Sequence, residues 1–272
     1  MSGVREVVVC GAFDDIRSRD LRFFHEASKL GKLTVLLWRD DSVLEFTGKT
    51  PKFPLAERKY LLDACRFVSE VVIADMPCSR DELPADLRAD VWADCASTLS
   101  ARRPAFCEAR NIQYRRFRAD ELDGFPELRP APSAPGRKKV IVTGCFDWLH
   151  SGHVRFFEEV AGYGDLTVVV GHDANIKFLK GEGHPLQSQD ERRYAVAAVK
   201  YVSQATIASG SGWLDADPEI KKLKPDIYAV NEDGDHGGKR EYCRANGIEY
   251  LVLRRTPADG LPSRSSTDLR GF

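Results

Sequence analysis

Two histidines with a glycine between them, His150, Gly152 and His153 in the segment HSGH, are suited by type and spacing to phosphate chemistry. They follow an apolar run, KKVIVTGCF, and open SGHVRFFEEVAGYG, whose apolar residues have helical spacing, so they mark the expected start of a helix. A helix N-terminus presents free backbone N–H groups and the positive end of the helix dipole, and imidazole rings add further donors. The pattern therefore indicates a phosphate site, although two surface histidines at a helix cap explain HSGH taken alone equally well.

An earlier stretch of the chain repeats the frame of this motif without its histidines. Residues 11–24, GAFDDIRSRDLRFF, align without a gap with residues 144–157, GCFDWLHSGHVRFF, but have Arg17, Arg19 and Asp20 at the positions of the histidines and the glycine. Further matched segments follow at offsets of 133 to 136 residues. We therefore expect one domain that has been duplicated.

The elements that must position the motif are strands and helices in alternation. Apolar runs such as DLTVVVG and PDIYAV alternate with helical stripes such as DERRYAVAAVKYV. This alternation predicts an α/β protein with two tandem Rossmann-like domains, each a doubly wound parallel sheet with its ligand beyond the carboxyl ends of the strands. We place a degenerate domain at 1–127, a proline-containing linker at 128–138 and the domain with the HSGH motif at 139–272.

Composition narrows the class of protein. A formal net charge of -1 over 272 residues provides no global field for nucleic acid or an anionic membrane, so any anion site must be local. The apolar runs are too short to span a bilayer and the N-terminus shows no signal-peptide pattern, so we expect a cytoplasmic protein. Seven cysteines without a C-x-x-C pair indicate reduced core residues rather than a disulfide framework or a zinc site.

With the strand and the Gly-Cys-Phe-Asp context before it, the HSGH segment resembles the cytidylyltransferase-like nucleotidyltransferase family. Four further segments match the family's pattern in order: FLKGEGHP with its lysine, DERRY with Glu-Arg, the acidic loop NEDGD, and the signature RRTPADGLPSRSSTDLR. Glycerol-phosphate, ethanolamine-phosphate and heptose-phosphate nucleotidyltransferases are similar members. One departure is the insertion PADGLPSR, which lengthens the signature loop and carries Arg264.

The resemblance implies that a phosphate oxygen of a phosphorylated alcohol or sugar attacks the α-phosphorus of CTP or ATP and releases pyrophosphate. CTP is favoured by family frequency, and no covalent enzyme intermediate is expected. Mg²⁺ is expected with the triphosphate, held by phosphate oxygens and water rather than by a protein cluster. The two domains are expected to pair as a pseudo-dimer within one chain, like the family's homodimers, and a further homodimer is left open.

The resemblance also assigns roles to individual residues. Those expected to be catalytic are His150, His153, Lys180 and Arg192. Lys180 is preferred to the nearby Lys177 because a Lys-Gly step follows the family pattern. Those expected to bind the nucleotide are Gly144, Cys145, Phe146, Gly152, Asn231, Asp233, Arg255, Thr256, Ser265, Ser266 and Thr267.

Three assignments compete with plainer explanations. Arg192 lies in a stretch that also fits an ordinary amphipathic helix. Asp147 and Asp173 are weaker candidates for substrate binding, and the recurrence of Asp147 as Asp14 in the first copy favours a structural role in the turn. The first copy is expected to have lost catalysis, because it lacks the histidines, the glycine and the serine-threonine signature.

Two other classes of protein remain as alternatives. A fragment of a class I aminoacyl-tRNA synthetase shares His-x-Gly-His, but it requires a lysine-rich second signature and a tRNA-binding domain that are not visible in the sequence. A nucleotide-sensing or scaffold protein would bind nucleotide without releasing pyrophosphate. A screen for pyrophosphate release separates it from an enzyme.

Overall fold

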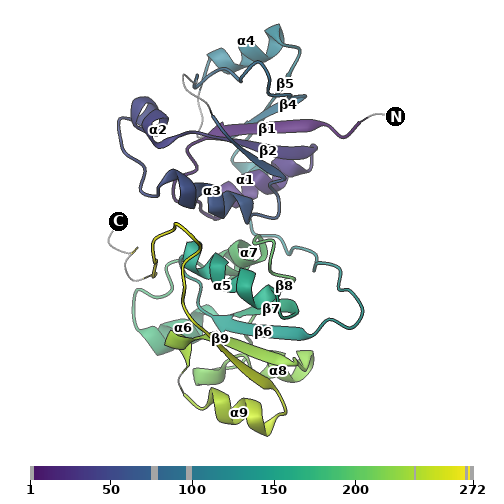
Figure 1. Cartoon of the computed structure of the whole chain (residues 1–272), viewed down its shortest axis with the longest axis vertical. Coiled ribbons are helices and arrows are strands. Elements are labelled where there is room, and N and C mark those ends of the chain that lie inside the picture. Colours follow the sequence, from purple (N-terminus) through teal and green to yellow (C-terminus); the bar gives the residue numbers. More distant parts are fainter. Residues whose placement is uncertain (1–2, 75–78, 96–99, 236, 267–268, 270–272) are drawn as a thin grey trace. The chain divides into compact units, whose positions relative to one another are not determined.

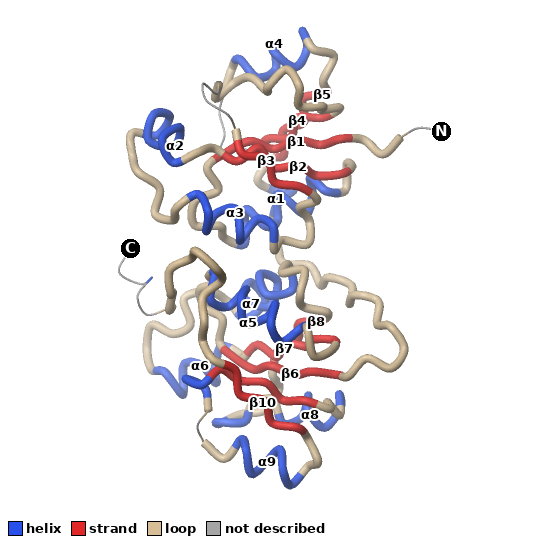
Figure 2. The backbone as a smooth tube through the Cα atoms, in the orientation of Figure 1, coloured by secondary structure: helices blue, strands red, loops and turns tan. Residues whose placement is uncertain are grey.

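The computed structural model describes residues 3–74, 79–95, 100–235, 237–266 and 269. The chain forms two compact units, Met1–Gly124 and Phe125–Phe272 (Figure 1). Each unit contains one five-stranded sheet in which all paired strands are parallel, and Figure 2 shows helices packed around each sheet. In the ranges that the structure describes, no helix is long and apolar enough to cross a membrane.

The sheet of the first unit has the strand order β3-β2-β1-β4-β5. Its strands are β1 (Glu6–Gly11), β2 (Lys32–Leu37), β3 (Glu70–Ile73), β4 (Val91–Cys95) and β5 (Gln113–Phe117). Its helices are α1 (Ser18–Ser28), α2 (Asp40–Thr47), α3 (Leu55–Asp63), α4 (Arg102–Ala109) and the 3₁₀ turn η1 (Asp120–Leu122).

The second sheet repeats this topology, with the order β10-β9-β6-β7-β8. Its strands are β6 (Lys139–Gly144), β7 (Asp165–Val170), β8 (Gln204–Ile207), β9 (Ile227–Asn231) and β10 (Glu249–Leu253). Its helices are α5 (Ser151–Ala161), α6 (Asp173–Lys180), α7 (Gln189–Ala197), α8 (Asp217–Leu223) and α9 (Lys239–Ala245), with 3₁₀ turns η2 (Gly212–Leu214) and η3 (Glu232–Gly234). The fold class expected from the sequence, two similar doubly wound α/β domains, is confirmed.

The central strand of each sheet is apolar because both of its faces are covered, as in other all-parallel sheets. Val8 in β1 and Ile141 in β6 are both fully buried. A glycine, Gly31 or Gly164, precedes the second strand of each unit, where a Cβ atom would lie 2.2 or 2.1 Å from a backbone carbonyl oxygen. The duplicated sequence therefore preserves both the core and the close backbone approach that the sheet requires.

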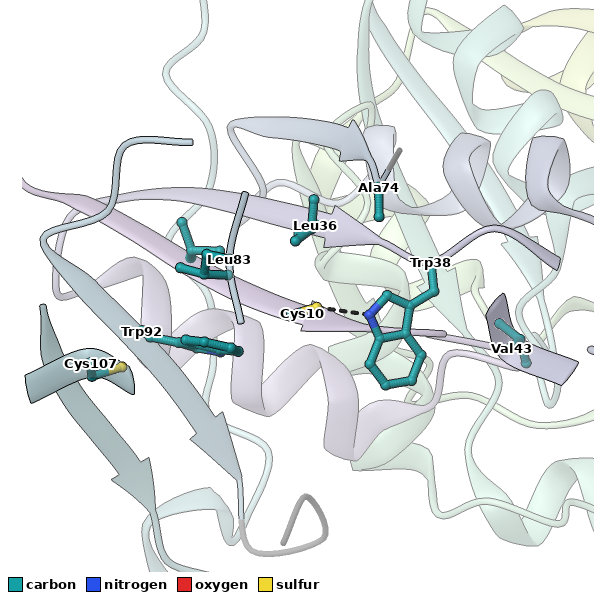
Figure 3. Close-up of a cluster of buried hydrophobic side chains, with 9 residues drawn as sticks. Cys10, Leu36, Trp38, Val43, Ala74, Leu83, Trp92 and Cys107 are labelled. Atoms are coloured by element: carbon teal, nitrogen blue, oxygen red, sulfur yellow. Dashed lines mark hydrogen bonds between the residues drawn. The ribbon is translucent and has the colours of Figure 1, made fainter. Parts of the chain in front are cut away.

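The core of the first unit contains two buried tryptophan side chains. Trp38, which stands where the second unit has Gly171, donates its indole N–H to Cys10 Sγ at 2.9 Å (Figure 3). Trp92 of β4 is fully buried in the same cluster. The indole ring of Trp38 thus lies beside the carboxyl ends of β1 and β2.

The segment expected to be a linker, 128–138, contains no helix or strand and is bonded to the second unit. The backbone N–H of Ala131 donates to the carbonyl oxygen of Ser203 at 2.9 Å. Arg137 forms an ion pair with Asp165 at 2.7 Å. The division between the units falls before this segment, after Gly124.

One fully buried arginine holds the strand ends together in each unit. Arg192 of α7 donates to the carbonyl oxygens of Cys145, Gly171 and Gln187 and to the carboxylate of Asp173. In the first unit Arg58 of α3 makes the equivalent bonds to Ala12, Trp38, Phe53 and Asp40. The clamp ties the residues after the first two strands to a helix, because carbonyls at a sheet end otherwise lack donors.

Replacing Arg58 by methionine tests this clamp. Several buried carbonyl oxygens would lose their donor, so we expect the free energy of unfolding to fall by about 3 kcal/mol. Urea unfolding followed by circular dichroism measures the change. Lys59→Met on the same helix removes a surface ion pair with Asp63 and serves as the control. Equal unfolding midpoints for the two variants would contradict the proposed function of the clamp.

Candidate functional site

A cavity of about 220 Å³ lies at the carboxyl ends of β6 and β9, the neighbouring strands from which the sheet is built outward in both directions. Doubly wound sheets bind ligands at such a point, because the loops after the two strands turn to opposite faces. The lining residues are Thr143, Gly144, Cys145, Phe146, Asp147, Gly152, His153, Phe156, Lys180, Ala229, Val230, Asn231, Asp233, Gly234, Lys239, Arg255 and Ser266.

His150 is the N-cap of α5 and is almost fully buried. Its Nδ1 accepts the backbone N–H of Gly152 at 3.1 Å, so the neutral ring carries its proton on Nε2. That Nε2 atom is buried and has no hydrogen-bond partner in the part of the chain that the structure describes. The capping bond therefore leaves one imidazole N–H available at the start of a helix, where anions are favoured.

His153 lies one helical turn further along α5 and stacks on His150, with ring centroids 4.0 Å apart. Its Nδ1 is also buried without a partner among the described residues. Burial, followed by the effect of His153, lowers the pKa of His150 to about 2. Burial, followed by the effect of Arg255, lowers the pKa of His153 to about 4. Both rings are therefore neutral at pH 7 when no anion is bound.

The turn before α5 supports the histidine pair. Phe146 has a left-handed backbone with φ of 53°, and its ring folds back over Gly144, where a Cβ atom would lie 2.7 Å from it. The ring also contacts His153 edge-on, with centroids 5.2 Å apart. A Cβ atom at Gly152 would lie 3.0 Å from the His150 ring and 3.2 Å from the carbonyl oxygen of Arg264. Glycine at 152 thus lets the inserted loop approach the helix.

Positive side chains line the cavity. Lys180, at the end of α6, lines it, whereas Lys177 forms an ion pair with Glu182 at 3.1 Å, so the structure favours Lys180. Arg255 lines the cavity as well, is paired with Asp233, and donates to the carbonyl oxygen of Arg264 at 2.8 Å. A cavity with these cations next to a helix N-terminus is suited to a polyphosphate.

Lys239 also lines the cavity, and sequence reasoning missed it. It follows two glycines in GDHGGKREY, and this Gly-Gly-Lys step after the acidic loop was the signal that could have identified it.

The remaining nucleotide-binding candidates divide between two adjoining hollows. Asn231 lines the cavity, and its Oδ1 is buried without a partner in the described ranges. Thr256 lines a smaller hollow that shares Asn231 and Arg255 with the cavity. Ser266 lines the cavity, and the Ser265 carbonyl oxygen accepts the N–H of Leu269 at 3.3 Å. Thr267 lies outside the described residues.

Three of the expected site residues have structural partners instead. Arg192 does not line the cavity, because its guanidinium is bonded to carbonyls and to Asp173 in the clamp described above, so we assign it a positioning role in place of a catalytic one. Asp173 accepts from Arg192 at 2.7 Å and likewise lies outside the cavity lining. Asp147 lines the cavity but accepts the backbone N–H groups of Leu186 and Gln187.

The first unit keeps the backbone turn of this site, but its charged side chains there form ion pairs with one another. Arg17, at the position of His150, donates to Asp15 at 2.9 Å, and Asp15 also pairs with Lys52 at 3.4 Å. Asp14 accepts backbone N–H groups from residues 52 and 53, as Asp147 does in the second unit from its own loop. The shared aspartate therefore belongs to the turn, and the two units differ at the helix entry, where only the first unit has an ion pair among the described residues.

No group of three His, Cys, Asp or Glu side chains within the described ranges is arranged to hold a metal ion.

Comparison with known proteins shows which family has this arrangement. A profile described as cytidylyltransferase-like matches residues 141–270. FAD synthase of Ferroglobus placidus is 38% identical over 120 residues, which are 43% of this chain and 75% of that protein. Bifunctional protein HldE of Campylobacter concisus is 36% identical over 134 residues, which are 47% of this chain and 28% of that protein.

A solved structure is also similar to part of this chain. The lipopolysaccharide core biosynthesis protein from Thermoplasma volcanium is 25% identical and aligns with 46% of this chain and 100% of its own, with a TM-score of 0.38.

The doubly wound sheet and the cavity beside the HSGH helix are the features of an α/β nucleotidyltransferase. This chain belongs to the cytidylyltransferase-like nucleotidyltransferase family, as the match to three quarters of an FAD synthase shows. The chain spans 28% of the length of the HldE protein, so most of the HldE sequence lies outside the matched region.

The lowered histidine pKa values predict a pH dependence of stability. The unfolded chain takes up protons at histidine as the pH falls below about 6.5, and the folded unit does not, so stability is full above this pH and is lost below it. For one such histidine the loss is about 1.4 kcal/mol per pH unit. Urea unfolding between about pH 7.5 and 5 should show a shallower pH dependence for His150→Gln than for the unmodified protein. Parallel profiles would show that His150 is charged in the fold.

Proposed function

We propose that the second unit transfers a nucleotidyl group from a nucleoside triphosphate to a phosphorylated small molecule and releases pyrophosphate. The observation that carries this proposal is the pair of buried imidazole nitrogens, Nε2 of His150 and Nδ1 of His153, that have no partner among the described residues. Leaving a polar atom buried and unpaired costs about 1–3 kcal/mol, so these atoms favour a bound polar ligand. The cations around them favour an anionic one.

The geometry supports a reaction without a covalent intermediate. A phosphate oxygen of the acceptor attacks the α-phosphorus, a new P–O bond forms, and the bond to the bridging oxygen of pyrophosphate breaks with its electron pair. No proton has to move, because the attacking phosphate is already ionised at pH 7. His150 donates from Nε2 to a phosphate oxygen, while Lys180 and Arg255 neutralise charge that accumulates on the phosphates. A bound polyanion also raises the pKa of both imidazoles, which strengthens their hydrogen bonds.

The identity of the nucleotide is suggested by the relatives. An FAD synthase is named for a product that contains an adenylyl group, which favours ATP over CTP as the donor for this chain. The same name makes FMN the first phosphorylated acceptor to test, with phosphorylated alcohols and sugars beside it. Mg²⁺ would enter with the triphosphate, held by phosphate oxygens and water, and would neutralise part of its charge.

A screen for pyrophosphate release tests the proposal. Four nucleoside triphosphates are combined with a panel of FMN, sugar phosphates and alcohol phosphates in the presence of Mg²⁺. We expect release that requires both one triphosphate and one acceptor. Nucleotide binding without release from any pair would favour the scaffold alternative over the enzyme.

Replacing His153 by alanine should lower turnover by about a hundredfold or more, because a phosphate-stabilising group at the reacting centre is lost. The steady-state rate of pyrophosphate release measures the effect. Asp20→Ala, at the equivalent position of the first unit, provides the matched control and should leave turnover unchanged. Equal rates for His153→Ala and the unmodified protein would remove His153 from the mechanism.

A further inference from the structure

The side chain of Lys239 places a second lysine in the cavity, apart from Lys180. Its Nζ donates to the carbonyl oxygen of Gly234 at 2.9 Å, and burial lowers the pKa of its ammonium. Lys239 lines the cavity but does not line the smaller hollow beside it. It therefore brings positive charge to a partly desolvated wall of the site.

The acidic residues near Lys239 are engaged elsewhere. Asp233 is paired with Arg255, and Asp235 accepts from Arg240 at 2.8 Å and from the Tyr250 hydroxyl at 3.0 Å. Lys239 itself forms no ion pair with any residue that the structure describes. A half-buried cation held by one neutral carbonyl is incompletely compensated. An anion from outside the chain would complete it.

At the position of Lys239 the first unit has a cation that is paired with a carboxylate of its own chain. Arg103, the counterpart of Lys239, is fully buried and forms an ion pair with Asp94 at 2.6 Å. Asp94 stands where the second unit has the apolar Val230, and it also accepts from the Tyr114 hydroxyl at 2.8 Å. The unit expected to lack activity thus pairs this cation with an internal carboxylate, whereas no carboxylate within the described ranges of the second unit forms an ion pair with Lys239.

The two units differ in the same way at the histidine end of the site, where the first unit has an ion pair and the second has none among the described residues. Asp15 compensates Arg17 in the first unit, whereas His150 keeps an unpartnered donor in the second. At both positions the first unit pairs a cation with its own carboxylate, and the second unit has a donor without such a pair among the described residues. Two such donors suit two anions, which is what a transfer from a triphosphate to a phosphorylated acceptor needs.

We infer that Lys239 binds the phosphate of the acceptor, an inference that rests on the function proposed above. The end of the cavity formed by Gly152, Phe156, Asn231 and Arg255 is shared with the smaller hollow at the N-terminus of α5 and suits the triphosphate. Attacking and leaving oxygens lie roughly in line across the reacting phosphorus, so the acceptor phosphate belongs in the part of the cavity that the hollow does not share. Lys239 and Lys180 line the cavity and not the hollow.

Replacing Lys239 by methionine tests this assignment in the full-length protein. Loss of a charge-assisted hydrogen bond should raise the KM for the acceptor by about tenfold or more, with the KM for the nucleoside triphosphate unchanged. Lys239→Arg keeps the charge and should recover part of the affinity. Lys221→Met, which removes an exposed lysine paired with Asp217 on α8, is the control. A rise in the KM for the triphosphate instead, or no rise in either KM, would overturn the inference.

A measurement without turnover keeps this inference separate from the proposed function. Inorganic phosphate should raise the thermal midpoint of His153→Ala, in which the histidine end is weakened, more than it raises the midpoint of the double variant His153→Ala/Lys239→Met. Equal increases would show that Lys239 binds no phosphate, even if the protein proves inactive on every acceptor. A smaller increase in the double variant supports the lysine site, and an inactive protein with that result would contradict only the proposed transfer reaction.

Discussion

The buried guanidinium of Arg192 is the constraint on which the second unit depends. Parallel strands end in carbonyl groups that no neighbouring strand can satisfy, and the loops leaving β6 and β7 must be held before they can present ligands. Arg192 bonds to the residues after both strands, and Arg58 does the same in the first unit. Because the clamp recurs in a unit without the HSGH motif, it serves the architecture. The positions of the two histidines, Gly152 and Lys180 follow from the ends of β6 and β7 that it holds.

The two units share the backbone features of the strand-to-helix turn and differ in the polar side chains placed on it. Both keep the aspartate that accepts backbone N–H groups of the following loop and the phenylalanine with a left-handed backbone. The frame is stabilised by its own hydrogen bonds and apolar packing, whereas the site of the second unit leaves polar atoms buried and unpaired. Such atoms lower stability unless a ligand completes them. In the first unit the ion pairs Arg17–Asp15 and Arg103–Asp94 occupy the corresponding places.

The sequence predicted the architecture well because its signals are periodic and repeated. The alternation of apolar runs and helical stripes indicated two doubly wound sheets, and HSGH after a strand indicated the helix that bears His150. Side-chain direction has no such signal. Arg192 matched a family motif yet its guanidinium bonds to carbonyls, and the Gly-Gly-Lys step before α9 does not say that the Lys239 side chain lines the cavity. Which charges stay uncompensated depends on contacts between segments far apart in the chain, such as Arg255 with Asp233.

The internal carboxylates of the first unit also limit what a single substitution there could achieve. Histidine placed at position 17 would still have Asp15 beside it, and Asp94 would remain beside the other cation. Each carboxylate would repel an incoming polyanion, so one substitution alone would not create an anion site. Removing Asp94 alone would take from the fully buried Arg103 the shorter of its two ion pairs, which are with Asp94 at 2.6 Å and with Asp81 at 3.6 Å among the described residues. Because the Asp94–Arg103 pair is buried, giving the first unit the charge arrangement of the second would take several substitutions made together.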